Sequence, residues 1–306
     1  MDSPTPRFVS RLLAGAGTVL CAVLTAASSP GQSLDAVGQI AATLEPTRKI
    51  VYKTVVDREL HLHVFEPDGF APDDRRPCFL IIHGGGWRGM SPRRMYPFAA
   101  HFAKLGMVGI APEYRLVRPD SGTNVFHCVQ DARSAVRYVR RHAAKLGIDP
   151  GRIVVSGASA GGHLAAGTAL FDGVEEPGED TSVSCMPDAL VLLFPVIDTS
   201  AEGYGNALLG DRWRELSPLH QVRPGMPPTI VFHGSADTTT PFAGAKAFHR
   251  AMLEAGNRCE LIVTEGGRHG YMMTSRPVFE ASLKRIEEYL AELDLLKVRP
   301  TQKTGG

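Results

Sequence analysis

The stretch Ile153-Val154-Val155-Ser156-Gly157-Ala158-Ser159-Ala160-Gly161-Gly162 decides the fold of this chain. A short apolar run leads into a serine flanked by glycine and alanine, and a helix-compatible run follows as far as Leu170. This order predicts a buried strand, a sharp turn at Ser159 and a helix. Small neighbours permit such a turn and leave the serine oxygen exposed. The alternative interpretation is a glycine-rich turn that begins a helix and has no catalytic role. We predict that Ser159 is a nucleophile.

Strands and helices are predicted to alternate on both sides of this turn. Short continuous apolar runs, typical of strands covered on both faces, occur at 78–82, 107–111, 153–155, 189–194, 230–232 and 261–263. Helical patterns occupy 92–105, 125–146, 159–170, 242–255 and 278–296. Alternating segments at 50–52 and 60–65 predict an antiparallel hairpin before them. The sequence therefore predicts an α/β fold with a mostly parallel sheet of about eight strands and helices on both faces.

A second glycine-rich turn follows the run at 78–82. Its sequence is HGGGW at 83–87, and three successive glycines allow the backbone to approach a substrate closely. We predict that the amides of Gly85 and Gly86, together with that of Ala160, form an oxyanion hole. His83 is expected to stabilise this loop by hydrogen bonding.

An acid and a base are expected in loops after later strands, in the order acid then histidine. Asp237 follows the run at 230–232, and His269 follows the run at 261–263 in a glycine-flanked loop. We predict that His269 is the general base and that Asp237 orients it. Asp198, one loop earlier, is the competing acid. The competing histidines are His163, His220, His233 and His249.

Five motifs carry a resemblance to a known family. They are HGGGW at 83–87, EYRL at 113–116, GASAGGH at 157–163, HGSADTTTP at 233–241 and GGRHGY at 266–271. In these motifs the chain resembles the hormone-sensitive-lipase-like branch of the α/β-hydrolases, and especially small bacterial acetyl xylan and feruloyl esterases. The resemblance implies an α/β-hydrolase fold and a serine carboxylesterase that hydrolyses short-chain, acetyl-type esters, including those of carbohydrates. It implies no metal and no organic cofactor, and it implies internal polar contacts for Arg115 and Asp131 without a direct chemical role.

The resemblance also bears on how the substrate is held. Larger lipase-like members have a helical cap built partly from a long N-terminal segment, whereas only a short lead-in, 30–48, precedes the first strand here. We therefore expect a reduced or absent cap and an open cleft. We predict that Trp87, Tyr204 and Trp213 contact the substrate. The segment 199–228, which holds Tyr204 and Trp213, has an alternative interpretation as a solvent-facing crossover loop with packed aromatic residues.

The N-terminal residues differ in character from the rest. Arg7 and Arg11 precede an uncharged stretch at 12–27 that ends in small residues, which is typical of a secretory signal peptide. We predict a signal at 1–29, the lead-in at 30–48, one catalytic domain at 49–296, a flexible tail at 297–306, and export to the periplasm or the outside of the cell. An uncleaved membrane anchor is the alternative.

The balance of charges limits the expected binding partners. Lys and Arg (33) almost balance Asp and Glu (32), so the strongly basic surface of a nucleic-acid-binding protein is not indicated. The expected partner is an ester, either a small molecule or an oligosaccharide, and no stable membrane span is expected after signal removal.

Four cysteines remain after the signal. They can either form disulfides, for which three pairings are possible, or stay free thiols. They are Cys78, Cys128, Cys185 and Cys259.

Two other classes of function are compatible with the motifs. A peptidase or amidase of the prolyl-oligopeptidase type shares the same order of serine, acid and histidine. A non-catalytic binding protein on this fold usually lacks the serine or the histidine, and both are present here. Failure to react with a fluorophosphonate would favour the binding protein.

Overall fold

The computed structural model describes residues 23–24, 36–56 and 58–297. The predicted signal peptide therefore lies outside the described residues except for Val23–Leu24. Residues 30–35 of the lead-in and the tail from residue 298 also lie outside them. The described part of the lead-in contains α1 (Ala36–Ala42), which was not predicted.

The described residues form one sheet in the order β1-β9-β8-β7-β6-β4-β5-β3-β2. The strands are β1 (Val23–Leu24), β2 (Arg48–Val55), β3 (Arg58–Phe65), β4 (Arg76–Ile82), β5 (Val108–Pro112), β6 (Ile148–Ala158), β7 (Ala189–Leu193), β8 (Thr229–Gly234) and β9 (Cys259–Thr264). Only the pairs β2–β3 and β3–β5 are antiparallel among them. The predicted mostly parallel sheet is confirmed, with β2 to β9 as its eight strands. The two-residue β1, which pairs with β9, is an addition that was not predicted.

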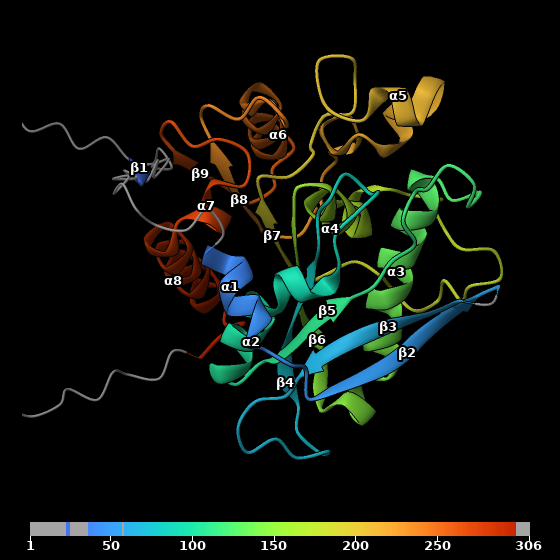
Figure 1. Ribbon diagram of the computed structural model, residues 1–306, viewed down its shortest axis with the longest axis vertical. Helices are drawn as coiled ribbons and strands as arrows, with labels where there is room; N and C mark the ends of the chain where they lie inside the picture. Colours follow the sequence, from blue (N-terminus) through green and yellow to red (C-terminus); the bar gives the residue numbers. More distant parts are fainter. Residues whose placement is uncertain (1–22, 25–35, 57, 298–306) are drawn as a thin grey trace, which may run out of the picture.

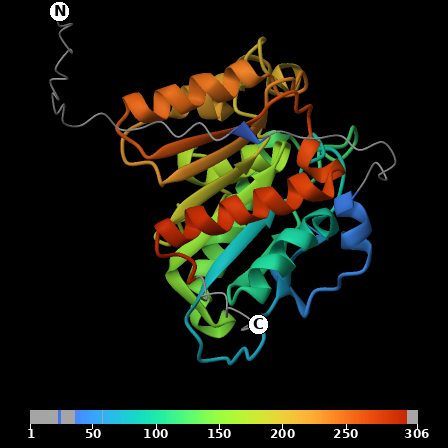
Figure 2. The ribbon, with the colours of Figure 1, turned by 90° about the vertical axis from the view of Figure 1, so that its left-hand side faces the viewer.

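Helices cover both faces of the sheet (Figures 1 and 2). One apolar cluster packs α1, α2 (Tyr96–Lys104), α7 (Tyr271–Thr274) and α8 (Arg276–Glu292) on one face. Figure 2 shows α8 and α2 lying across that face. A second cluster packs α3 (Val125–Arg141), α4 (Ala160–Leu170) and α6 (Phe242–Glu254) on the other face. The five predicted helical segments correspond to α2, α3, α4, α6 and α8.

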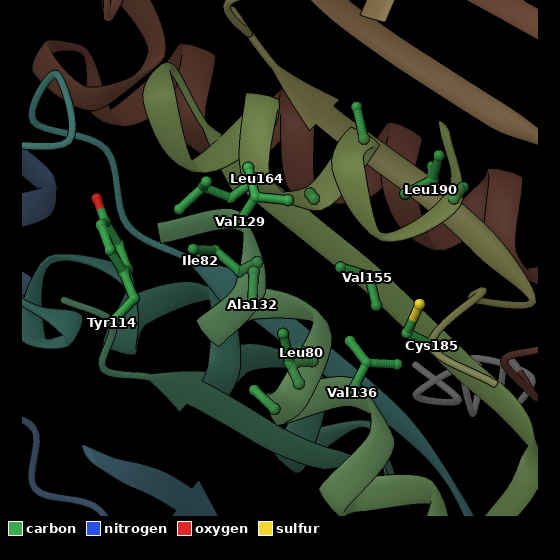
Figure 3. Close-up of a cluster of buried hydrophobic side chains, with 14 of the residues drawn as sticks. Leu80, Ile82, Tyr114, Val129, Ala132, Val136, Val155, Leu164, Cys185 and Leu190 are labelled. Atoms are coloured by element: carbon green, nitrogen blue, oxygen red, sulfur yellow. The ribbon is translucent and has the colours of Figure 1, made fainter. Parts of the chain in front are cut away.

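The central strands are buried because their apolar runs face helices on both sides. Figure 3 shows Leu80 of β4 and Val155 of β6 beside Val136 of α3, with Leu164 of α4 in the same cluster. All four side chains are fully buried, and each such aliphatic side chain contributes roughly 1.5–3 kcal/mol of hydrophobic stabilisation. This packing gives a rigid base to the loops at the carboxyl ends of β4 and β6.

Helix α3 is amphipathic as expected, but part of its charged face is covered. Arg137 Nη1 lies 2.6 Å from Glu175 Oε2, and Arg133 Nε donates to the same oxygen at 3.2 Å. Arg115 donates to both carboxylate oxygens of Asp131, at 2.8 and 2.7 Å. The internal polar contacts implied for Arg115 and Asp131 are therefore present, and the structure shows that the two residues bind each other. A segment after α4 shields Arg133 and Arg137 from solvent.

The four cysteines of the domain are free thiols in the structure, and all four are buried. Burial raises the pKa of Cys259 to about 12, and it also raises the pKa of the Cys78, Cys128 and Cys185 thiols. Of the two alternatives, disulfides or free thiols, the structure therefore shows free thiols. In the described part of the chain, every helix is too short or too polar to cross a membrane.

Candidate active site

Ser159 occupies a strained turn between β6 and α4. Its φ of 56° and ψ of −121° are unusual for a residue with a side chain. The turn is possible because of close backbone packing: a Cβ added at Gly157 would lie 2.1 Å from the carbonyl oxygen of Gly161. The Ser159 amide donates to the carbonyl of Leu193 at 2.9 Å, so β7 anchors the turn. The predicted strand, turn and helix are present.

Three predicted residues meet at this turn. Ser159 Oγ lies 2.9 Å from His269 Nε2, and His269 Nδ1 lies 2.8 Å from Asp237 Oδ2. Asp237 comes from the loop after β8, and His269 comes from the loop between β9 and α7. Each contact has ordinary hydrogen-bond length. The fold thus joins a serine, an imidazole and a carboxylate in one row from three separate loops.

Asp237 is held firmly at the end of this row. The amides of Thr239 and Thr240 both donate to its Oδ1 at 2.9 Å, and Thr240 Oγ1 donates to its Oδ2 at 2.9 Å. Burial tends to raise the pKa of the Asp237 carboxyl, but the hydrogen bonds from His269 and Thr240 outweigh burial and lower it. The carboxylate is therefore ionised at neutral pH and can support a charged imidazole.

The alternative acid and histidines have other partners. Asp198 accepts the amide of Ser200 at 2.8 Å and lies 4.0 Å from His220. His163 is fully buried and donates from Nε2 to the carbonyl of Leu216 at 2.7 Å. His233 donates to the carbonyl of Thr240, which supports the loop that carries Asp237. The structure therefore brings Asp237 and His269, rather than the alternatives, to Ser159.

The glycine loop at 83–87 lies beside the serine turn. Tyr114 Oη donates to the carbonyls of His83 and Gly84 at 3.1 Å each, and its ring stacks on the His83 ring at 4.3 Å. His83 Nδ1 donates to the Gly84 carbonyl at 2.9 Å, and burial lowers the pKa of His83 to about 4. A neutral His83 that braces the loop agrees with the role expected for it.

Two of the predicted oxyanion donors, Gly85 and Gly86, line the cavity over Ser159, and the third, Ala160, follows Ser159 directly. Gly85 accepts hydrogen bonds from the amides of Arg88 and Gly89, which closes the loop into a tight turn. Within the described ranges, no acceptor is recorded for the amides of Gly85, Gly86 and Ala160. Donors without an internal acceptor remain available to a substrate oxygen.

A cavity of about 380 Å³ opens over Ser159 and His269. Much of its wall is apolar and includes Met90, Met95, Phe194 and Met273. The Phe194 ring packs edge-on against the His269 ring with 5.2 Å between their centroids. Unbranched methionine side chains adapt readily to ligands of different shape. The cavity can therefore accept a small apolar group bonded to the reacting carbonyl.

Two of the three residues predicted to contact the substrate do not reach this cavity. Trp87 is fully buried, because its ring fills the space left by the missing side chain of Gly205. Trp213 lies on η3 (Gly210–Leu216) and packs edge-on against His220 at 4.9 Å. Tyr204 does line the cavity. The prediction for Trp87 is therefore wrong as a direct contact, since the protein encloses its ring completely. Trp213 is only partly buried, and its contact with a substrate outside this cavity stays a prediction.

Sequence reasoning missed Thr240 and Tyr114 as supporting residues. The run Asp237-Thr238-Thr239-Thr240 has the form of a turn in which an aspartate accepts backbone amides two and three residues ahead, so Thr240 could have been found. Tyr114 acts across a contact between separate loops, which spacing alone does not reveal.

In the described ranges, no group of three or more His, Cys, Asp or Glu side chains is arranged to hold a metal ion. The expectation of a reaction without metal or cofactor stays a prediction.

The strand order and the position of Ser159, Asp237 and His269 at the carboxyl ends of parallel strands define an α/β-hydrolase. The BD-FAE family model matches residues 62–252, which is more than half of the chain, and the chain belongs to this family.

Its relatives include esterases of known structure and sequence. Thermogutta terrifontis esterase 2 in its apo form is 40% identical, with a TM-score of 0.78 over 82% of this chain and 96% of that one. Esterase LipQ of Mycobacterium tuberculosis is 29% identical over 65% of this chain and 51% of its own length. Endo-1,4-beta-xylanase B of Butyrivibrio fibrisolvens is 28% identical over 70% of this chain and 36% of its own length. The chain thus spans about half the length, or less, of these two curated relatives.

Proposed function

We propose that this protein is a serine carboxylesterase that hydrolyses short-chain acyl esters through an acyl-enzyme. The observation that carries the proposal is the hydrogen-bonded row from Ser159 through His269 to Asp237, placed beneath a mostly apolar cavity. A nucleophile within hydrogen-bond reach of a base, which is itself oriented by a carboxylate, is the arrangement that acyl transfer requires.

The first half of the reaction forms the acyl-enzyme. His269 Nε2 removes the proton from Ser159 Oγ as this oxygen attacks the ester carbonyl carbon. The electron pair of the carbonyl bond moves to oxygen, and the amides of Gly85, Gly86 and Ala160 stabilise the resulting oxyanion. Collapse of the tetrahedral intermediate breaks the bond to the alcohol, which leaves with the proton held by His269. Asp237 stabilises the imidazolium in between.

The second half releases the acid. Water gives a proton to His269 Nε2 and attacks the acyl carbon, and the oxyanion again forms at the three amides. Expulsion of Ser159 Oγ, which takes the proton back from His269, regenerates the enzyme. Each residue therefore serves in both halves of the cycle.

We further propose that the acyl group is short and that the alcohol is a decorated sugar. Structures of the Thermogutta esterase carry propionate and butyrate, which supports a short acyl group. The similarity to a xylanase supports a carbohydrate ester. A cavity of about 380 Å³ that opens at the surface suits a small acyl group inside and a bulkier alcohol outside.

The test compares the specificity constant for an acetylated xylo-oligosaccharide with that for an aryl acetate, with Ser159→Ala as the blank. A higher value for the sugar ester would support a carbohydrate esterase. Turnover of the aryl ester alone would overturn the carbohydrate part and leave a general short-chain carboxylesterase. A blank as active as the wild type would overturn the assignment of Ser159.

We also propose export, on the basis of the N-terminal sequence. N-terminal sequencing of the protein recovered from outside the cytoplasm should begin close to residue 30. A protein retained in the membrane with an intact N-terminus would favour the anchor instead.

A further inference from the structure

Two aromatic residues between β7 and β8, Phe194 and Tyr204, reach the cavity over Ser159, and of these Tyr204 carries a hydroxyl. Its hydroxyl lies directly over the glycine loop, since a Cβ added at Gly86 would lie 2.7 Å from Tyr204 Oη. Gly86 also has a φ of +60°, which disfavours a side chain. The bare backbone of Gly86 therefore allows the phenol to approach one of the proposed oxyanion donors.

The loop that carries Tyr204 is held in place by hydrogen bonds among its own residues. The Tyr204 amide donates to the carbonyl of Asp198 at 2.9 Å, and the Gly203 amide donates to that of Ser200 at 3.0 Å. Asn206 Nδ2 donates to the carbonyl of Thr199 at 3.0 Å. These contacts close the loop, so the position of Tyr204 is fixed before a substrate arrives.

The ring of Tyr204 is also fixed by packing. Trp87, which is fully buried, lies behind it with 5.6 Å between ring centroids and 38° between ring planes. Trp87 in turn packs against Gly205 and against the buried ring of His163 at 5.1 Å. A tyrosine braced in this way loses little conformational freedom when it forms a hydrogen bond.

The hydroxyl of Tyr204 has no hydrogen-bond partner among the residues that the structure describes. Trp87 supports the ring on one side, and hydrogen bonds within the loop hold the backbone of Tyr204 in place. A phenol is a good hydrogen-bond donor, and this one lies beside Gly86, whose amide is one of the proposed oxyanion donors, in the wall of the cavity. Its position beside Gly86 and its open donor thus point to the same substrate atom.

We propose that Tyr204 is a catalytic residue whose hydroxyl donates a hydrogen bond to the carbonyl oxygen of the substrate as that oxygen becomes an oxyanion. The proposal rests on the proposed esterase function and adds a side-chain donor to the three backbone amides. Because the bond strengthens as charge develops, it contributes more to the transition state than to the bound ester. Its loss should therefore lower kcat and leave KM nearly unchanged.

The test is Tyr204→Phe, which keeps the ring and its contact with Trp87. With p-nitrophenyl acetate we expect kcat to fall roughly 10- to 100-fold. Loss of one oxyanion donor in another enzyme costs about 10²–10³, and here three backbone amides would remain. The matched control is Tyr138→Phe, the same substitution on α3 and outside the cavity, and its kcat should stay within about threefold of wild type. A Tyr204→Phe enzyme with kcat within threefold of wild type, or one changed in KM alone, would overturn the role.

A second measurement separates this proposal from the esterase proposal. The Thermogutta esterase has been observed phosphorylated by paraoxon, and attack on phosphorus also places charge on an oxygen in the oxyanion hole. We expect Tyr204→Phe to be phosphorylated more slowly than wild type by a similar factor. If wild type neither reacts with paraoxon nor turns over an ester, the esterase proposal fails. If wild type does both and Tyr204→Phe reacts at the same rate, the role of Tyr204 alone fails.

Discussion

Replacing Asp237 by asparagine changes one atom at the end of the serine–histidine–aspartate row. Asp237 Oδ1 accepts two amides, from Thr239 and Thr240, so the asparagine must keep its oxygen there. Its NH₂ group then takes the place of Oδ2, which lies 2.8 Å from His269 Nδ1. A donor now faces Nδ1, and the imidazole must carry its proton on Nε2 instead. That proton faces Ser159 Oγ, so His269 can no longer accept the proton of the nucleophile.

The size of the effect follows from this tautomer. A serine hydrolase whose histidine is fixed in the wrong tautomer loses about 10⁴-fold in kcat, which corresponds to ~5 kcal/mol in the activation barrier. The assay is the steady-state hydrolysis of p-nitrophenyl acetate at neutral pH, together with the melting temperature of each variant. Since the asparagine oxygen still accepts the amides of Thr239 and Thr240, we expect a folded protein with little activity.

Asp198→Asn is the matched control, because Asp198 lies in the loop after the preceding strand, β7, and was the competing acid. It accepts a backbone amide from Ser200 and has no contact with His269 recorded in the described ranges, so its activity should stay within about threefold of wild type. An Asp237→Asn variant with more than a tenth of wild-type kcat would refute the reasoning. So would a greater loss in Asp198→Asn than in Asp237→Asn.

Three further predictions concern packing, pH and thiol reactivity. Gly161→Ala would place a Cβ 2.2 Å from the carbonyl oxygen of Ile82. We therefore expect the free energy of unfolding, measured with urea, to fall by about 2 kcal/mol or more. An unchanged midpoint of urea unfolding would contradict this close packing. Burial lowers the pKa of His163 from 6.5 to about 4. As the pH falls from 6.5 to 4, His163 takes up a proton in the unfolded chain but not in the folded protein, so the free energy of unfolding decreases. In His163→Gln the unfolding free energy should therefore decrease less between pH 7 and pH 5 than in wild type, and an equal decrease would count against a neutral buried His163. The buried thiols Cys78, Cys128, Cys185 and Cys259 should react with Ellman's reagent only after unfolding, and fast reaction of any of them in the native protein would show that it is accessible.

The sequence predicted those features that depend on local pattern. Continuous apolar runs located the parallel strands because a strand covered on both faces must be apolar throughout. The serine turn was predictable because close packing of Gly157 on Gly161 tolerates no side chain. Asp237 and His269 were predictable because this fold orders its functional loops along the chain.

Features that depend on three-dimensional packing were not predictable in the same way. Trp87 follows the glycine loop directly, yet its ring packs against Gly205, which lies far along the chain. Trp213 and Tyr204 belong to one segment, and only the fold determines which of them reaches the cavity. Arg133 and Arg137 lie on a charged helix face that would be exposed if a later segment with Glu175 did not cover it.

The most direct test of the whole account is to identify the residue that paraoxon modifies. Wild-type protein is treated with paraoxon, the remaining esterase activity is followed, and the modified peptide is located by mass spectrometry. We predict one diethylphosphoryl group on Ser159, formed in proportion to the loss of activity and absent from Ser159→Ala. Two results would contradict the assignment of Ser159 as the nucleophile. One is a loss of activity that follows modification of another residue, and the other is full inhibition while Ser159 stays unmodified.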